Sequence, residues 1–117
     1  MQIRVKRVYE SAEAGDGTRV LVDGIWPRGV SRASAGVDAW ARDVAPSAEL
    51  RRWFDHQPAR WDAFRARYFA ELDAAPQAVS NLLAQVSGGV VTLVYAARET
   101  RYNNAVALAE YLQARSR

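Results

Sequence analysis

The sequence predicts a single small α/β domain: a mostly parallel sheet of about three or four strands covered by helices. Three observations predict it. Short β-branched segments lie near the start of the chain, apolar residues at helical spacing fill its middle, and residues 90–96 form a strongly apolar strand. Continuous apolar strands are typical of a sheet that is covered on both faces, which is usually a parallel one.

Two strands are predicted in the first part of the chain. In residues 3–8, apolar and basic residues alternate closely enough to indicate a strand. Residues 19–23 are short, β-branched and apolar, as expected of a buried strand. The turn-rich stretch 11–18 separates the two. The strand at 90–96 is then the third member of the sheet.

Helices fill the interval before the third strand, and one more follows it. Ser47 is expected to cap the first helix, Pro58 to open the second and Pro76 to start the third. In the second helix, apolar residues recur at spacings of three and four, which is the helical period. The last helix is predicted to run from about 103 to 115, with one apolar side.

The composition excludes several kinds of chemistry. The 117 residues include no cysteine and one histidine, His56, so we expect no disulfide, thiolate metal site or cysteine nucleophile. His56 lies at a predicted helix end, where a structural role is favoured over one in a site. No other residue has ligand spacing with it, so neither a metal nor a cofactor is predicted.

The net charge of +3 rests on arginine, because Lys6 is the single lysine among 16 basic residues. Arginine suits bidentate contacts with phosphate or carboxylate. A GC-rich genome also supplies it in excess, and the surplus of alanine favours that explanation for most of the arginines.

No targeting or membrane segment is predicted. The first eight residues alternate in polarity, and the longest apolar run, 88–97, is far shorter than the roughly 20 residues of a membrane helix. We therefore expect one cytoplasmic domain, 1–117, without a membrane partner. The sequence gives no indication of the oligomeric state.

A first candidate site lies in residues 23–29, directly after the second strand. Pro27 fixes its own φ and restricts Trp26, so this loop is expected to be rigid. Ligands of parallel sheets bind beyond the carboxyl ends of the strands, which makes Asp23, Trp26 and Arg28 a candidate ligand platform. The structural alternative is that Trp26 packs over the core and Arg28 pairs with Asp23.

A second candidate site lies in residues 97–104, between the third strand and the last helix. Asn103 or Asn104 is expected to cap that helix, which leaves free amide protons directed into the loop. With Arg98 nearby, this helix N-terminus is a candidate anion site. The layout resembles the phosphate loop of cysteine phosphatases, but the nucleophile is missing, so that chemistry is excluded.

Several segments together resemble one bacterial family. Residues 20–23 followed by Trp26-Pro27-Arg28-Gly29 look like the signature of the YeaO-like proteins, a family of unknown function catalogued under number 488. The resemblance continues over nearly the whole chain. The further matching segments include Lys6 to Tyr9, Trp40, Ala45-Pro46-Ser47, Trp53-Phe54, Glu71-Leu72, Thr92 to Ala97 and Asn103.

The resemblance implies a compact α/β domain but no reaction, because none is established for the family. It also implies that residues at matching motif positions work together: Asp23, Arg28, Tyr95, Arg98 and Asn103. The family typically has arginine where this chain has Gly24. The candidate site therefore lacks one cation that its relatives are expected to carry.

Two classes of function remain open. In the first, the domain binds or acts on an anionic small molecule that carries phosphate or carboxylate. Arginines would hold the anion, the carboxylate would orient an arginine or act as a base, and a tyrosine would donate a proton. The predicted catalytic residues are Asp23, Arg28 and Tyr95, and the predicted ligand-binding residues are Tyr9, Trp26, Arg98 and Asn103.

In the second class, the domain is a non-enzymatic module that binds nucleic acid or protein. Arg51-Arg52-Trp53 and Arg60-Trp61 mix arginine with aromatic residues, as nucleic-acid-binding surfaces do. However, these arginines alternate with acids along their helices, and no nucleic-acid-binding motif is present. We therefore favour the small molecule over a nucleic acid as the partner.

Overall fold

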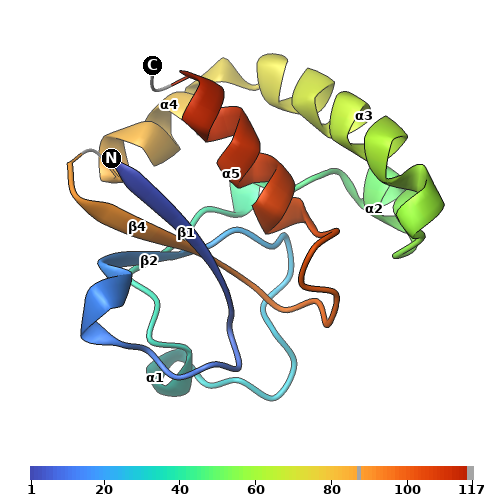
Figure 1. Cartoon of the computed structure of the whole chain (residues 1–117). Helices are drawn as coiled ribbons and strands as arrows, with labels where there is room; N and C mark the ends of the chain where they lie inside the picture. Colours follow the sequence, from blue (N-terminus) through green and yellow to red (C-terminus); the bar gives the residue numbers. More distant parts are fainter. Residues whose placement is uncertain (87, 116–117) are drawn as a thin grey trace.

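The computed structural model describes residues 1–86 and 88–115, which form one sheet in the spatial order β1-β4-β2-β3 (Figure 1). All three strand pairs are parallel. The strands are β1 (Gln2–Arg7), β2 (Thr18–Leu21), β3 (Ala39–Trp40) and β4 (Val90–Tyr95). The three strands expected from the sequence are confirmed, as is the parallel α/β fold class.

The helices expected after Ser47, Pro58 and Pro76 are present. The α-helices are α1 (Arg32–Ala35), α2 (Ala48–Phe54), α3 (Trp61–Asp73), α4 (Pro76–Gln85) and α5 (Asn104–Arg115). Short 3-10 helices are η1 (Ala14–Asp16), η2 (Arg42–Val44) and η3 (Pro58–Arg60). Pro58 therefore opens a 3-10 turn that leads into α3. The Ser47 hydroxyl caps α2 by accepting a hydrogen bond from the Leu50 amide, at 3.1 Å.

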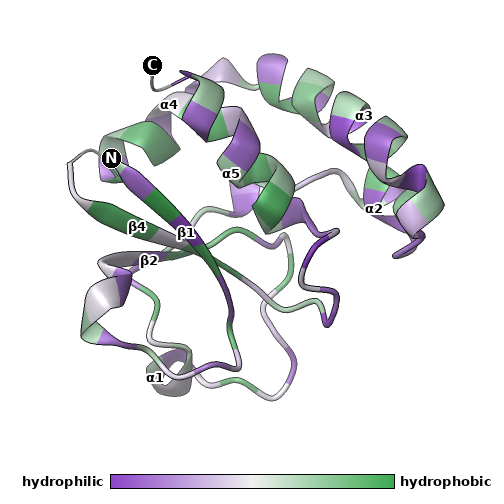
Figure 2. Ribbon diagram, viewed as in Figure 1, coloured by the Kyte–Doolittle hydropathy of each residue, from purple (hydrophilic) through white to green (hydrophobic). Residues whose placement is uncertain are grey.

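The central strand β4 is buried on both faces, as its continuous apolar sequence predicts (Figure 2). Val91, Leu93 and Tyr95 face a main core that they share with α2, α3, α4 and α5. Val94 faces a smaller core on the other side, where Trp26 and the residues around α1 pack. In Figure 1 the long helices accordingly lie on one side of the sheet and α1 on the other.

Residues 31–40 hold two elements that the sequence did not predict. Helix α1 has four residues and is capped by Ser31, whose hydroxyl accepts a hydrogen bond from the Ser34 amide. Strand β3 has two residues and pairs with Val20 and Leu21 of β2. Both elements are too short for their apolar residues to show a helical period of 3.6 or a strand period of two. The spacing of apolar residues therefore could not predict them.

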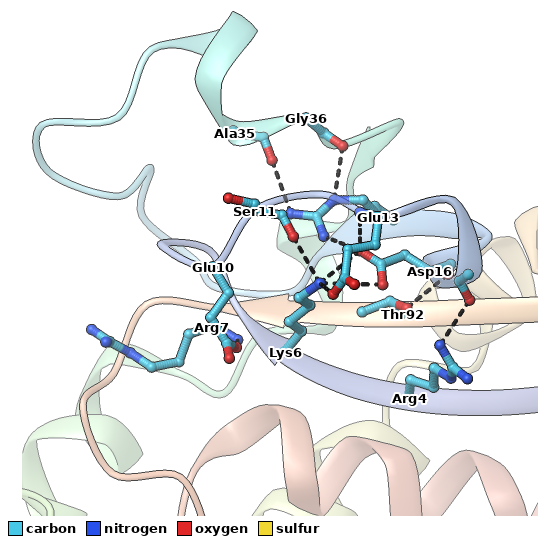
Figure 3. A network of polar contacts seen from close by, with 12 residues as sticks. Arg4, Lys6, Arg7, Glu10, Ser11, Glu13, Asp16, Ala35, Gly36 and Thr92 are labelled. Atoms are coloured by element: carbon cyan, nitrogen blue, oxygen red, sulfur yellow. Dashed lines mark hydrogen bonds and ion pairs between the residues drawn. The ribbon is translucent and has the colours of Figure 1, made fainter.

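A buried ion network fixes the small-core side of the sheet (Figure 3). Asp16 is 3% exposed, and its Oδ2 accepts hydrogen bonds from Arg19 Nη1 at 2.6 Å and Lys6 Nζ at 3.2 Å. Arg19 also donates to the Gly36 carbonyl at 2.9 Å, and Thr92 donates to the Asp16 carbonyl at 2.7 Å. The network thus joins β1, β2, β4 and the end of α1.

In the part of the chain that the structure describes, no helix is long and apolar enough to cross a membrane.

Candidate functional site

A pocket of about 390 Å³ lies beyond the carboxyl ends of β2 and β4, where the sequence places both candidate loops. Residues 23–28 form one wall and residues 96–97 and 102–104 form another. The third wall comes from α2 and the turn after it, through Arg51, Phe54 and His56, and Phe64 of α3 also reaches the pocket. The two candidate loops therefore share one cavity.

Asp23 lies at the meeting point of the two loops. Its Oδ2 accepts a hydrogen bond from the Ala96 amide at 3.0 Å, and its Oδ1 accepts one from Asn104 Nδ2, also at 3.0 Å. Burial raises the pKa of this carboxyl, against the lowering effect of these two hydrogen bonds and of the nearby Arg51 charge. Asp23 is thus a partly buried carboxyl held by neutral donors.

Two arginines line the pocket with their side chains unpaired. Arg28 comes from the loop after β2 and Arg51 from α2. Among the described residues, neither guanidinium has an ion pair, a hydrogen bond or a ring contact, and both residues are exposed. The expected alternative, an ion pair between Arg28 and Asp23, is therefore wrong.

Most other basic side chains have partners within the fold. Arg65 pairs with Glu110, Arg115 with Asp73 and Arg19 with Asp16. Four others lie over tryptophan rings: Arg32 on Trp26, Arg42 on Trp40, and both Arg60 and Arg67 on Trp53. The arginine–aromatic mixture in α2 and α3 consequently has a structural use, because Arg67 lies 4.1 Å from the Trp53 ring centre.

Aromatic rings form the deep end of the pocket. Phe54 and Phe64 stack with their centres 4.4 Å apart, and Trp61 stacks on Phe64 at 5.7 Å. Tyr102 lies against Trp61 at 5.5 Å and closes the side nearest α5. The pocket lining therefore combines aromatic rings with Arg28, Arg51, His56 and the Asp23 carboxyl. Among the described residues, no group of acidic and histidine side chains could hold a metal ion.

Comparisons with known proteins place this chain in one family. The family model described as the inactive DUF488-N3 subclade matches residues 2–117. The chain belongs to this family. It is 46% identical to an uncharacterized protein of Mycobacterium tuberculosis over 115 residues, which cover 97% of this chain and 96% of that protein. It is 39% identical to the uncharacterized protein YeaO of Escherichia coli over 113 residues, with 97% and 98% covered.

The resemblance to the YeaO-like proteins is thereby confirmed. No solved structure gives a significant match. Both relatives are described as uncharacterized, and the matching family model is described as an inactive subclade.

In this DUF488-N3 family member, four of the seven predicted site residues line the pocket: Asp23, Trp26, Arg28 and Asn103. Asn103 caps α5, as expected, because its Oδ1 accepts a hydrogen bond from the Val106 amide at 3.0 Å. Trp26 lines the pocket and also packs on the small core, where it meets Trp40 edge to face. Trp26 therefore packs on a core, as the structural alternative predicted, and it also borders the cavity.

The other three predicted residues lie outside the pocket lining. Tyr95 is 3% exposed and belongs to the main core, where burial raises the pKa of its hydroxyl. Tyr9 is half exposed and donates to the Arg28 carbonyl at 3.1 Å, so it contacts the backbone of the site loop. Arg98 is exposed and does not line the cavity.

The lining residues that were not predicted for the site include Arg51, His56 and Asn104. Asn104 had been considered only as a helix cap, and His56 was assigned a structural role. His56 lines the pocket from a turn in which both Asp55 and His56 have positive φ, 46° and 54°. The Gln57-Pro58 step after these residues is a signal for a turn, but no local pattern shows that it faces a cavity.

Proposed function

We propose that this domain binds an anionic small molecule bearing phosphate or carboxylate in the pocket beyond β2 and β4, without catalysing a reaction. Arg28 and Arg51 hold the anion. The supporting observation is that both residues line the cavity and that neither guanidinium has an ion pair or a hydrogen bond among the described residues. Forked arginine contacts are the strongest that a protein commonly makes to carboxylate and phosphate.

Binding without chemistry is favoured by two further features. The family model that the chain matches is described as inactive. In addition, the predicted proton donor Tyr95 is buried in the main core and does not itself line the pocket, although its side chain is hydrogen-bonded to the lining residue Asn103. The acid–base side chains Asp23 and His56 line the cavity, and both oxygens of Asp23 already accept hydrogen bonds from the protein.

Isothermal titration of the full chain with inorganic phosphate, benzoate and a nucleoside monophosphate tests the proposal. We expect at least one of these anions to bind, and Arg28→Gln and Arg51→Gln each to weaken it roughly tenfold, since a hydrogen bond to a charged group contributes about 1.5–3 kcal/mol. Arg52→Gln is the matched control, because Arg52 neighbours Arg51 on α2 but does not line the pocket. Absence of binding, or equal weakening by Arg52→Gln, contradicts the proposal.

A further inference from the structure

We infer that the pocket selects an anion carried on a flat aromatic ring that also bears a neutral N–H donor, with Asp23 accepting from the donor and Arg51 holding the anion. The inference rests on the proposed function and specifies its ligand class. It follows from the placement of three kinds of group around one cavity: a carboxyl, a cation and stacked rings.

Asp23 has acceptor capacity left for a ligand. A carboxylate offers about four lone-pair sites. Within the described residues, each Asp23 oxygen accepts one hydrogen bond, from the Ala96 amide and from Asn104 Nδ2. In the described parts of the chain, no basic nitrogen forms an ion pair with Asp23, although the residue lines the cavity. A ligand N–H donor would complete its hydrogen bonding.

Arg51 is held close to Asp23 without neutralising it. Its charge acts on Asp23 through space, yet the two form no ion pair. Arg51 Nη1 lies 3.8 Å from the position that a Cβ on Gly24 would occupy, so the guanidinium extends over this glycine. This distance is an ordinary van der Waals contact, so the Arg51 cation lies directly beside Gly24. One ligand can then meet a negative group and a positive group at different points of the same cavity.

The rings between these groups favour a flat, uncharged ligand body. Phe54 and Phe64 are 5% and 2% exposed and still line the pocket, so the cavity reaches down to a stack of aromatic rings. Aromatic rings prefer offset or edge contacts with another ring. An ammonium group would lose its hydration against this floor, whereas a neutral ring N–H or amino group loses much less.

The size of the cavity limits the ligand further. A volume of about 390 Å³ is near the lower end of the range for small-molecule pockets, which is roughly 300–1,000 Å³. A single substituted ring or a mononucleotide fits this range, and a polymer segment would have to extend outside it. An aminoaryl carboxylate and a nucleoside monophosphate share the required chemistry.

Four small probes separate the three features of the ligand. 4-Aminobenzoate has a flat ring, a neutral amino donor and an anion. Benzoate lacks the donor, aniline lacks the anion, and cyclohexanecarboxylate lacks the flat ring. Dissociation constants of the full chain are measured by chemical-shift titration, which reaches millimolar affinity. A nucleoside monophosphate, compared with ribose 5-phosphate, provides the phosphate-bearing arm.

We expect 4-aminobenzoate to bind at least about fivefold more tightly than each of the other three probes. In Asp23→Asn the ratio of benzoate to 4-aminobenzoate dissociation constants should fall to about one. In Arg51→Gln the binding of 4-aminobenzoate and of benzoate should weaken by the same factor, and the binding of aniline should stay unchanged. Arg52→Gln should leave every ratio unchanged. An alternative outcome is that the nucleoside monophosphate has a lower dissociation constant than 4-aminobenzoate, while ribose 5-phosphate binds more weakly than both. That result assigns the site to phosphate-bearing rings and supports the inference equally.

Two results overturn the inference while leaving the proposed function intact: equal affinity for benzoate and 4-aminobenzoate in the wild type, or an unchanged ratio in Asp23→Asn. If none of the anions binds, the proposed function fails as well. Should Asp23→Asn not fold, the carboxyl ¹³C signal of Asp23 in the wild type replaces it. That signal must move with 4-aminobenzoate more than with benzoate, and equal movement rejects the inference.

Discussion

The side-chain amide of Asn104, the first residue of α5, donates to Asp23 Oδ1 at 3.0 Å and to the Val22 carbonyl at 3.2 Å. One side chain thus joins the last helix to the end of β2. It brings together two loops that are far apart in the sequence and that both line the pocket. The shape of the candidate site depends on this junction.

Replacing Asn104 should therefore affect both stability and the acidity of Asp23. We expect Asn104→Ala to lower the free energy of unfolding by about 1–3 kcal/mol, because two partly buried acceptors lose a donor. The pKa of Asp23 should rise further, since a hydrogen bond to its charged form is removed. Urea unfolding and a carboxyl NMR titration measure the two effects. Asn81→Ala is the control: Asn81 is an exposed amide on α4 that accepts from Gln77, and its loss should cost at most about 0.5 kcal/mol.

Asp23 should make stability fall as pH rises. Burial raises its folded-state pKa above the ordinary value of 3.8, so the folded protein holds this proton to a higher pH than the unfolded chain does. The stability that Asp23 contributes is therefore largest below pH 3.8 and is lost between 3.8 and the raised folded pKa. Urea unfolding across this pH range measures how much more stable the wild type is than Asp23→Asn. If this difference in the free energy of unfolding grew with pH, the folded-state pKa of Asp23 would be lowered instead.

Asp16 should have the opposite pH dependence. Burial acts to raise its pKa, but the Glu13 amide and the cations of Arg19 and Lys6 outweigh burial and hold the pKa below 3.8. Its stabilising contribution is therefore complete above pH 3.8 and is lost as pH falls through the lower folded pKa.

At neutral pH, Asp16→Ala should cost about 3–5 kcal/mol, because Arg19, which is 4% exposed, is left as an unpaired buried charge. Glu13→Gln is the comparison, since the Glu13 side chain is 73% exposed and pairs only with Lys6 in the described network. Its cost should stay below about 1 kcal/mol. If the two variants lost similar free energies of unfolding, the buried Asp16 network would contribute no more stability than a surface ion pair does.

Gly17 permits a close approach between β2 and β4 that no other residue allows. Its φ is +63°, and a Cβ there would lie 2.1 Å from the Val90 carbonyl oxygen, inside contact distance. We expect Gly17→Ala to cost about 3 kcal/mol or more, from strain and from the clash together. Gly29→Ala separates the two causes, because Gly29 has φ +76° with nothing within 4 Å, so its cost should be about 1 kcal/mol. Thermal unfolding of both variants gives the comparison.

Much of the fold followed from the sequence because its elements are long enough to show a period. The apolar β4 and the three- and four-residue spacing in α3 needed no tertiary information, whereas α1 and β3 had no period to display. The position of the pocket was also predictable, since parallel strands end at one edge of the sheet.

The sequence did not show which arginines line the pocket. Arg98 lies on a candidate loop but does not line the pocket, while Arg51 lies on α2 and does. Which of the arginines faces the cavity is decided by how α2 packs on the sheet through Leu50 and Phe54. The burial of Tyr95 was not predicted for a related reason, because its strand register directs it into the main core with Val91 and Leu93.

The central claim is that Arg28 and Arg51 hold an anion in this pocket. The most direct measurement is a titration of ¹⁵N-labelled protein with 4-aminobenzoate in which the arginine side-chain Nε–Hε signals are followed. The account predicts that the signals of Arg28 and Arg51 move and saturate together, while those of Arg52 and Arg98 stay in place. Saturable movement of Arg98 or Arg52 with Arg28 and Arg51 unmoved, or no saturable movement at all, would contradict it.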